Sequence, residues 1–373
     1  YKKEAVIFLG TGLVQANTIK IAKKKFFTIG FDKNLRSPGK KYCDLFYKSN
    51  ANNFDFIIKK LKKLNYLKFK FIWSNNDIFL VTRAKLESKL KLQFKNSSKK
   101  VVDLTLNKLK FGYLYKTHKI IIPNLSKFKN STKIICKPIK SSGSKNVEII
   151  TYNNNLEKFK KNNFIFQEYY EGNEYGLNFI SYKNKIFTLN SVKRYFDHNQ
   201  TMVPIGSVST NKNIIPKIIK NLIIKIFNDL KIVGKIKVDI IKTNKGKFKI
   251  IEISNRFHGE IDTTITFEKN GLSAFENLLN LIENNNISKK IINKKRFYGY
   301  INLFRDKLKL KTYNKILNQN NLKFVEKINR FKENKNKIKS TQDIKSYILF
   351  YAKKIPTNKE FIKIFNSLNG FIR

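Results

Sequence analysis

The stretch that decides the fold is VDIIKTNKGKFKIIEISNRFHG, residues 238–259. Its β-branched and aromatic residues predict two strands, and Asn244–Gly246 supply the turn that joins them. Each predicted strand carries one acid among apolar neighbours, Asp239 on the first and Glu252 on the second. A carboxylate in a buried sheet is unfavourable unless a cation or another partner compensates its charge. Two acids on adjacent strands present oxygen ligands side by side, an arrangement that suits Mg²⁺.

The same stretch has a simpler interpretation, in which both acids are solvated or paired with lysines of an ordinary hairpin. On this stretch alone the metal site and the plain hairpin are equally good hypotheses. Arg256 follows the second acid by a few residues, and its guanidinium fork has the geometry to hold a phosphate. The remainder of the chain has to distinguish the two hypotheses.

Length and composition indicate a folded protein. The chain has 373 residues, enough for two or three domains, and 41% of them are hydrophobic. It contains no apolar run of about 18 residues, so we expect no membrane span, and its first residues lack the pattern of a signal peptide. Cys43 and Cys136 form neither a disulfide framework nor a zinc pattern. Free thiols are typical of a reducing compartment, so we expect a cytoplasmic protein.

The net charge of +51 is extreme, with 77 Lys and Arg against 26 Asp and Glu. Such a charge predicts a polyanion as partner. However, the excess is spread over every segment, and lysine is over-used together with asparagine, isoleucine and phenylalanine, all of which have AT-rich codons. Compositional drift of the genome explains this joint bias without a partner. Nucleic acid is therefore the less favoured partner, and a non-catalytic polyanion binder stays as the alternative from another functional class.

The amino-terminal segment has the pattern of a parallel α/β unit. An apolar strand at residues 5–9 runs into Gly10 and Gly12, a helix is predicted from Leu13 to Lys25, and a second strand ends at Asp32. Such units bind ligands at the carboxyl ends of their strands. The glycines would allow close backbone approach, although a purely structural turn explains them equally well.

The middle of the chain predicts a flap over an anionic ligand. Helical periodicity runs from about residue 101 to 130, with Lys108 near its start. A short strand, residues 133–138, carries Lys137 on an apolar background, and the small-residue loop 141–147 connects it to a second strand. A lysine within a buried strand is unfavourable unless it meets an anion. Backbone N–H groups of the loop could cover phosphates.

Further elements follow in order. Strands are expected at residues 164–170, 175–182 and 186–193, a turn at 171–174, a loop with Arg194 and His198, helices at 214–230 and 274–283, a polar linker at 284–295, a strand at 347–351 and a helix at 359–366.

Taken in order, these pieces resemble the ATP-grasp superfamily of carboxylate–amine ligases, and within it the branch of biotin carboxylase and the large subunit of carbamoyl-phosphate synthase. The resemblance covers nearly the whole chain. It rests on GTGLVQ at 10–15, DKN at 32–34 together with PG at 38–39, NK at 107–108, KP at 137–138 with SSGS at 141–144, QEYYEGNE at 167–174, and Asp239 with EISNR at 252–256. No single piece is specific, but six pieces in the right order are.

The resemblance implies a mixed α/β fold of the α+β ATP-grasp type. It implies an α/β domain at residues 1–100, an ATP-grasp domain at 101–295 with a flap subdomain at about 130–193, and a small strand-rich carboxyl-terminal subdomain at 296–373. Dimers are common in this branch, so the resemblance also allows a homodimer.

The resemblance also implies the role of each site residue. Lys108 and Lys137 would hold ATP phosphates, and Ser142, Gly143 and Ser144 would close over them. Glu168, Tyr169 and Tyr170 would contact adenine, and Glu174 the ribose hydroxyls. Asp239 and Glu252 would carry Mg²⁺, with Mn²⁺ as a substitute, while Arg256 would stabilise the transferred phosphoryl group with Lys137 as the second catalytic residue. Gly10, Gly12, Asp32 and His258 are candidates for the substrate site.

The implied activity is an ATP-dependent ligation, in which a small-molecule carboxylate becomes an acyl-phosphate that an amine attacks. A bicarbonate-using carboxylase is a neighbouring alternative in the same fold. The chain departs from the family pattern at several positions: Ser254 stands where the family has Asn, Asn107 where it has Asp, Gln167 where it has Glu, and Asn146 where it has a glycine. Substrates are set by loops that vary on a shared scaffold, so the sequence does not name them.

Overall fold

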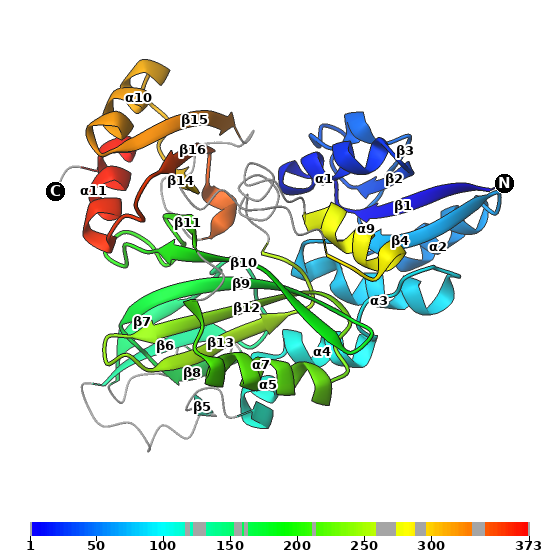
Figure 1. Cartoon of the computed structure of the whole chain (residues 1–373), viewed down its shortest axis with the longest axis horizontal. Helices are drawn as coiled ribbons and strands as arrows, with labels where there is room; N and C mark the ends of the chain where they lie inside the picture. Colours follow the sequence, from blue (N-terminus) through cyan, green and yellow to red (C-terminus); the bar gives the residue numbers. More distant parts are fainter. Residues whose placement is uncertain are drawn as a thin grey trace.

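The computed structural model describes residues 2–115, 120–121, 132–152, 159, 163–210, 214–258, 274–287, 296–329 and 340–371. Within these residues three sheets carry the architecture, one parallel and two antiparallel (Figure 1). The predicted α/β fold class, with a parallel sheet at the amino terminus, is confirmed.

The amino-terminal sheet has the strand order β3-β2-β1-β4, and all of its pairings are parallel. Its strands are β1 (Lys3–Leu9), β2 (Phe27–Asp32), β3 (Leu45–Lys48) and β4 (Leu67–Trp73), and its helices are α1 (Leu13–Lys23), α2 (Phe54–Lys62) and α3 (Leu80–Lys89). The last five residues of β1 are apolar and buried, as expected for a parallel strand covered on both faces. The carboxyl ends of β1, β2 and β4 therefore meet at one edge.

Helix α9 (Ala274–Asn284) returns to this amino-terminal unit late in the chain, and Figure 1 shows it beside β4. Its residue Phe275 packs against three aromatic rings of the unit, with ring centroids 6.5 Å from Phe26, 5.6 Å from Phe71 and 5.4 Å from Trp73. This aromatic cluster packs helix α9 against the amino-terminal sheet.

The largest sheet is antiparallel and has the order β13-β12-β9-β10-β11-β14-β16-β15. Its strands are β9 (Gly172–Tyr182), β10 (Lys185–Tyr195), β11 (Gly206–Thr210), β12 (Gly234–Thr243), β13 (Phe248–Ser254), β14 (Phe297–Leu303), β15 (Leu322–Asn329) and β16 (Ser346–Ala352). The strands expected beyond residue 296 are thus present, and they extend the central sheet through the pairing of β11 with β14. The domain limits near residues 100 and 295 stay predictions.

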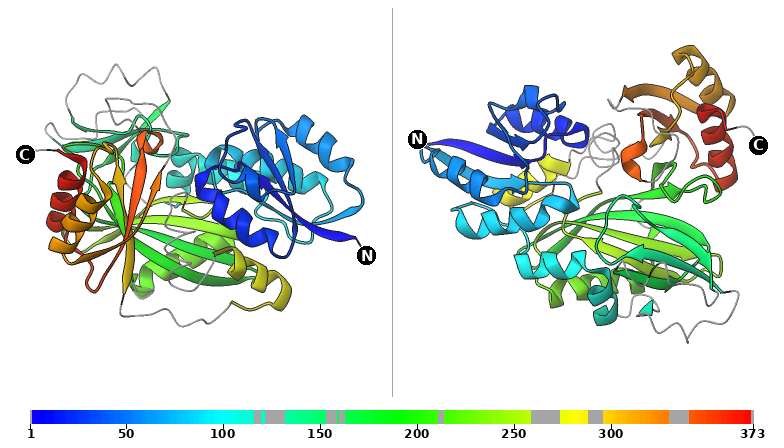
Figure 2. Two further views of the ribbon diagram at one scale, coloured as in Figure 1. Left: turned by 90° about the horizontal axis from the view of Figure 1, so that it is seen from above. Right: turned by 180° about the vertical axis from the view of Figure 1, so that it is seen from behind.

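Two groups of helices cover this sheet. Helix α7 (Lys217–Asp229) buries Ile219, Ile223, Ile226 and Phe227 in the core beneath β9, β12 and β13. Helices α10 (Leu310–Gln319) and α11 (Asn358–Asn369) pack on the carboxyl-terminal strands. The two further views show that α10 and α11 lie at the opposite end of the molecule from the amino-terminal sheet (Figure 2).

The small sheet forms the flap and has the order β5-β8-β6-β7. Its strands are β5 (Ile120–Ile121), β6 (Lys133–Pro138), β7 (Glu148–Thr151) and β8 (Phe164–Glu168), and all of their pairings are antiparallel. The predicted strand–loop–strand flap is therefore present, with Lys137 on β6.

The helical pattern expected from about residue 101 to 130 is confirmed only in part, because a break at Asn107 and a strand at residues 120–121 interrupt it and residues 122–131 lie outside the described chain. The chain forms α4 (Lys99–Leu106) and α5 (Lys108–Tyr115), and then the strand β5. Asn107 separates the helices, because its backbone is extended and its Oδ1 accepts from the N–H of Lys110, 3.1 Å away. An asparagine that hydrogen-bonds nearby backbone favours a helix start over a helix interior.

Two predicted loops are shorter than expected, because the neighbouring strands extend into them. Residues 172–174 of the expected turn begin β9, and Arg194 lies within β10 rather than in the loop after it. The two strands pair so that Arg194 stands opposite Glu174, and their side chains form an ion pair of 3.0 Å. Opposite charges across a pair of strands stabilise the pairing, which extends both strands beyond their apolar runs.

The hairpin of residues 238–254 is formed as predicted, and it contains a bulge. Asp239 pairs with Glu252, whereas the next residue, Ile240, pairs with Ile250, so one residue of β13 is extra. A bulge of this kind changes the direction of neighbouring side chains. Here it lets the two acids stand directly opposite each other.

Among the described residues, every helix is too short or too polar to cross a bilayer. Cys43 and Cys136 are free thiols. Most of the predicted linker at residues 284–295 lies outside the part of the chain that the structure describes.

Candidate active site

One cavity of about 870 Å³ lies where the flap, the central sheet and the amino-terminal edge meet. That volume is in the range of small-molecule and cofactor sites. Fifteen of the sixteen residues chosen from the sequence line it. They are Gly10, Gly12, Asp32, Lys108, Lys137, Ser142, Gly143, Ser144, Glu168, Tyr169, Tyr170, Glu174, Asp239, Glu252 and Arg256. The sixteenth, His258, is not on the cavity wall.

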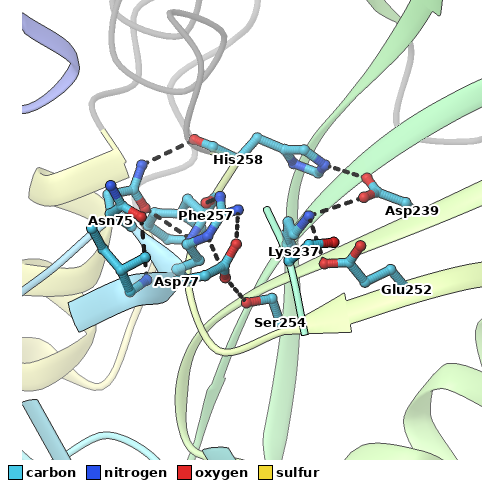
Figure 3. Close-up of polar contacts among 12 residues, drawn as sticks. Asn75, Asp77, Lys237, Asp239, Glu252, Ser254, Phe257 and His258 are labelled. Carbon is cyan, nitrogen blue, oxygen red and sulfur yellow. Dashed lines mark hydrogen bonds and ion pairs between the residues drawn. The ribbon is translucent and has the colours of Figure 1, made fainter. Parts of the chain in front are cut away.

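Asp239 and Glu252, which we call the acid pair, face the cavity from neighbouring strands. Lys237 lies two residues before Asp239 and therefore on the same face of β12. Its Nζ is 3.0 Å from Asp239 Oδ2 and 3.2 Å from Glu252 Oε1, so one ammonium group joins both carboxylates (Figure 3). Arg194 approaches Asp239 from β10, with Nη1 3.5 Å from Oδ1.

Both acids are ionised at neutral pH. Burial raises the pKa of Asp239, but the charges of Arg194 and Lys237 outweigh burial and hold its pKa well below the ordinary value. Burial likewise raises the pKa of Glu252, and the charges of Lys237 and Lys108 lower it by more. The acid pair therefore presents two negative carboxylates to the cavity.

The acid pair fits a divalent metal. Its oxygens already converge on one cation, and hard carboxylate oxygens are the ligands that Mg²⁺ and Mn²⁺ prefer. Across the described residues, no group of three or more His, Cys, Asp or Glu side chains forms a closed metal cage. Mg²⁺ is usually bound by one or two carboxylates together with phosphate oxygens and water.

Lys108 and Lys137 bring positive charge to the cavity wall. Lys137 on β6 is only 5% exposed, and its burial, together with the charge of Lys108, lowers its pKa to about 8. Lys108 at the start of α5 donates from Nζ to the carbonyl oxygen of Ser141, 2.8 Å away, at the root of the flap loop (residues 141–147). A buried ammonium of lowered pKa gains stability from an anion, so this wall suits phosphate.

The pKa of Lys137 predicts a pH dependence. Between pH 7 and pH 9 the side chain loses its proton, so the affinity for an anionic nucleotide should fall as pH rises. Lys137→Arg keeps its charge over this range and should bind with an affinity that changes little. Isothermal titration of ADP at pH 7, 8 and 9 checks this, and equal pH profiles for both proteins would contradict it.

The flap loop is held by backbone geometry and by the carboxyl-terminal segment. Gly143 has φ +66°, and its carbonyl oxygen accepts from the N–H of Thr341, 3.0 Å away. A Cβ at Gly143 would lie 2.4 Å from Thr341 Oγ1. A residue that follows β15 thus fixes the loop predicted to cover phosphates.

Gly143→Ala should therefore weaken nucleotide binding, because the left-handed backbone and the close contact with Thr341 both oppose a side chain. We expect a loss of about tenfold in ADP affinity, with strain of about 1–3 kcal/mol. Gly246→Ala is the control, since Gly246 also has a positive φ (+75°) but a Cβ there meets no atom within 4 Å. Equal ADP affinities of the two variants would contradict this account of the loop.

Aromatic side chains form the wall predicted for adenine. Tyr169 meets His198 edge-on at a centroid distance of 6.0 Å, and His198 stacks on Phe196 at 5.3 Å. Tyr170 donates from its hydroxyl to Glu168 Oε2, 2.9 Å away. The side chain of Glu168 is therefore hydrogen-bonded to Tyr170. The predicted contacts with adenine would then come from backbone groups and ring faces.

Glu174, the predicted ribose contact, is engaged with Arg194. Burial raises the pKa of Glu174 to about 7, although the charge of Arg194 acts in the opposite direction. Glu174 and Arg194 form an ion pair of 3.0 Å, and both side chains line the cavity together with the acid pair.

Arg256 uses much of its guanidinium in hydrogen bonds within the protein. Its Nε donates to Asp77 Oδ1, 2.7 Å away, its Nη2 pairs with Asp77 Oδ2, and its Nη1 donates to the carbonyl oxygen of Phe257. Ser254 Oγ also donates to Asp77 Oδ1, at 2.6 Å. Asp77 follows β4, so this cluster joins the amino-terminal unit to the hairpin that carries the acid pair.

His258 lies behind the acid pair rather than in the cavity. Its Nε2 is 2.6 Å from Asp239 Oδ1 and its Nδ1 is 2.9 Å from Asn178 Oδ1, while its carbonyl oxygen accepts from Asn75 (Figure 3). Burial lowers the pKa of His258 to about 4, so the ring is neutral at pH 7. A neutral imidazole in this place orients Asp239, as partners behind metal ligands commonly do.

At the amino-terminal edge, Asp32 shapes the glycine turn. Its Oδ2 accepts from the N–H of Thr11 at 2.7 Å, and its Oδ1 from the N–H of Asn34 at 2.9 Å. Gly10 has φ +82°, and a Cβ there would lie 2.8 Å from Phe79. Both residues line the cavity, together with the start of α1.

Sequence reasoning missed the functions of Asp77 and Lys237 and placed Arg194 in a loop. The signal for Lys237 was present, because Lys235, Lys237 and Asp239 alternate along one strand and so share one face of a buried sheet. Asp77 lies in the polar segment that follows β4. Its partner Arg256 is 179 residues away along the chain, so no local pattern indicates the contact.

Comparisons with known proteins agree with this geometry. Residues 105–260 match the family model of an ATP-grasp domain. The solved structure of N5-carboxyaminoimidazole ribonucleotide synthetase from Thermotoga maritima is similar at a TM-score of 0.70 and 16% identity, over 97% of this chain and 96% of that one. An L-amino acid ligase from Bacillus licheniformis is similar at a TM-score of 0.75 and 13% identity, over 98% and 96%.

A third similar structure is the biotin carboxylase domain of 2-oxoglutarate carboxylase from Hydrogenobacter thermophilus, in complex with MgADP, ADP and bicarbonate. Its TM-score is 0.66 at 12% identity, over 95% of this chain and 87% of that one. A search of curated proteins gave no match. At such low identity these likenesses establish the fold.

Proposed function

We propose, from the premise that this chain is an ATP-grasp protein, that it is an ATP- and Mg²⁺-dependent ligase. The proposed reaction activates a small-molecule carboxylate as an acyl-phosphate, which an amine then attacks to form a C–N bond. ATP and Mg²⁺ are the proposed cofactors, and Mn²⁺ is a substitute for the metal.

The observation that carries the proposal is the convergence of Lys108, Lys137, Asp239 and Glu252 on one cavity. These residues come from α5, β6, β12 and β13, and they bring two cations and two anions to the lining of one cavity. A nucleotide triphosphate needs both charges, because cations neutralise its phosphates while acids hold the metal that bridges them. An ordinary hairpin with solvated acids does not require the buried Lys137 and the half-buried Lys108.

In the proposed mechanism the chain positions reactants and neutralises charge. Lys137 and Lys108 hold the phosphates, and the flap loop excludes water above them. The carboxylate oxygen of the acceptor attacks the γ-phosphorus, and the bond from that phosphorus to the bridging oxygen of ADP breaks. The amine then attacks the carbonyl carbon of the acyl-phosphate, phosphate departs with the C–O bonding pair, and the nitrogen loses a proton.

Mg²⁺ would be held by Asp239 and Glu252 and would supply charge neutralisation at the phosphate oxygens. Arg256 is better placed to position the hairpin through Asp77 than to hold the phosphoryl group with its whole fork. The Nε, Nη1 and Nη2 groups of Arg256 all make hydrogen bonds within the protein. We therefore propose Arg256 only as a contact at the cavity wall.

We place the acceptor at the amino-terminal end of the cavity. Gly10, Gly12 and Asp32 line this end, and Lys33 and Arg36 add two positive side chains to it. These cations suit an acceptor that carries a negative charge, as a carboxylate does. His258 acts on this site only through Asp239.

Bicarbonate is the second candidate for the carboxyl substrate. It is favoured by the similar carboxylase domain whose complex contains MgADP and bicarbonate. A screen of ADP release over amino acids, small organic acids and bicarbonate, each with and without added amines, tests the proposal. Release of ADP that depends on one carboxyl compound is the expected result, and release that no carboxyl compound stimulates would contradict the ligase.

The non-catalytic polyanion binder is separated from the ligase by a thermal shift. A ligand that binds only the folded protein raises the midpoint of unfolding. We expect ATP with Mg²⁺ to raise it at moderate salt, whereas a polyanion binder would show steeply salt-dependent affinity for DNA or RNA.

The remaining expectations stand with this proposal. We propose the domain limits near residues 100 and 295, a cytoplasmic location, small-molecule partners and a homodimer, as the resembled branch suggests. Size-exclusion chromatography with light scattering tests the last of these.

A further inference from the structure

Lys237 is a buried cation that the sequence motifs leave without a role. It is 6% exposed, it lines the cavity, and its Nζ lies between the two carboxylates of the acid pair. Figure 3 shows it on the strand face that also carries Asp239. From this position the ammonium group of Lys237 contacts the carboxylates of both Asp239 and Glu252.

Lys235, two residues earlier on the same face, has a structural explanation that Lys237 lacks. Lys235 is 1% exposed, donates to the carbonyl oxygen of Ser74 at 2.6 Å and lies 3.7 Å from the centroid of the Trp73 ring. It thus holds the end of β4 against β12. The hydrogen bond of Lys237 is instead directed at the acid pair, at the wall of the cavity.

A divalent ion and the ammonium of Lys237 require the same oxygens. Mg²⁺ binds carboxylates at about 2.0–2.1 Å, whereas Lys237 holds Asp239 Oδ2 at 3.0 Å and Glu252 Oε1 at 3.2 Å. Arg194 approaches the other oxygen of Asp239, so the positive charge around that residue is already high. Two added positive charges are unfavourable unless new negative charge enters with them, and nucleotide phosphates carry such charge.

We propose that Lys237 competes with the divalent cation for the acid pair, so that the metal enters the site only together with nucleotide phosphates. This inference rests on the proposed function, because it takes Asp239 and Glu252 as the metal ligands. It makes Lys237 a positioning residue that sets the order of binding.

Mn²⁺ binding measured by electron paramagnetic resonance tests the inference without any turnover. The full-length protein is titrated with Mn²⁺ alone and again with saturating ADP. We expect wild-type protein to bind Mn²⁺ at least about tenfold more tightly when ADP is present. Equally tight binding with and without ADP would overturn the inference, and this comparison needs no variant.

Lys237→Met removes the ammonium and keeps an unbranched side chain. We expect it to gain a nucleotide-independent Mn²⁺ site at least about tenfold tighter than any in wild type. Lys242→Met is the matched control, since Lys242 is an exposed lysine on the same strand that does not line the cavity, and it should leave Mn²⁺ affinity within about twofold. Lys237→Met with Glu252→Gln should lose the gain, which assigns it to the acid pair.

Wild-type affinity for Mn²⁺ in Lys237→Met, or an equal gain in Lys242→Met, would overturn the role of Lys237. If ADP binds none of these proteins, the proposed function fails, while the nucleotide-free comparison still decides whether Lys237 excludes the metal.

Discussion

Lys137→Ala and Glu252→Ala should each reduce Mg²⁺-dependent ADP release by about 100- to 1,000-fold or more, because each removes a fixed charge at a site where phosphoryl transfer develops charge. Lys137 is buried on β6 and Glu252 on β13, and both line the cavity. Lys137 is 5% exposed and the side chain of Glu252 is 20% exposed, so water screens their charges only in part and the loss of one charged group is large. A coupled assay of ADP release measures the effect.

Two residues nearby supply matched controls. Lys133 lies on the same strand as Lys137, and it pairs with Glu171 at 3.3 Å on the surface, where the two side chains are 61% and 59% exposed. Lys133→Ala and Glu171→Ala change the same residue types and should leave ADP release within about twofold, since exposed ion pairs contribute little. Normal turnover by both cavity variants would refute the site.

Asp77→Asn should destabilise the junction between the amino-terminal unit and the hairpin by about 3–5 kcal/mol, because it leaves the buried guanidinium of Arg256 without its counter-charge. Asp77 also accepts from Ser254, so the substitution disturbs both ends of the cluster. Trp73 is the only tryptophan and ends β4, close to Phe257, with ring centroids 6.0 Å apart. Its fluorescence during urea unfolding therefore reports on this junction.

The same cluster predicts a pH dependence of stability. Burial raises the pKa of Asp77, but Arg256 outweighs burial and lowers the pKa below its ordinary value. A carboxyl group with a lowered folded pKa stabilises the protein above its unfolded pKa of about 3.9, and this stabilisation is lost as pH falls through the folded pKa. Asp77→Asn should remove this part of the acid dependence. Asp229→Asn, which changes an exposed aspartate at the end of α7, should unfold like wild type, and a shift of less than about 1 kcal/mol in Asp77→Asn would contradict the account.

The acid pair could be predicted from the sequence because the information is local. A short turn fixes the register of β12 against β13, so two acids in apolar surroundings indicate their own proximity. The flap with Lys137 was predictable for the same reason, since its strands are joined by one loop. The resemblance to the ATP-grasp superfamily, drawn from motifs in order, is confirmed for the fold and for the domain at residues 105–260.

Distant pairings could not be predicted in this way. The contact of Asp77 with Arg256 and the pairing of β11 with β14 join segments far apart in the sequence, and no local pattern specifies them. The position of Arg194 opposite Glu174 depends on how far β9 and β10 extend, which the cross-strand ion pair decides. Lys237 was overlooked because the abundance of lysine in this chain makes any one lysine uninformative.

The convergence of Lys108, Lys137, Asp239 and Glu252 on one nucleotide is the central claim, and calorimetric titration with a non-hydrolysable ATP analogue and Mg²⁺ tests it most directly. We predict one nucleotide per chain and a loss of about tenfold or more in affinity for each of Lys108→Ala, Lys137→Ala, Asp239→Asn and Glu252→Gln, as expected for charged hydrogen-bonding groups. Wild-type affinity in these four variants, or no binding by the wild-type protein, would contradict it.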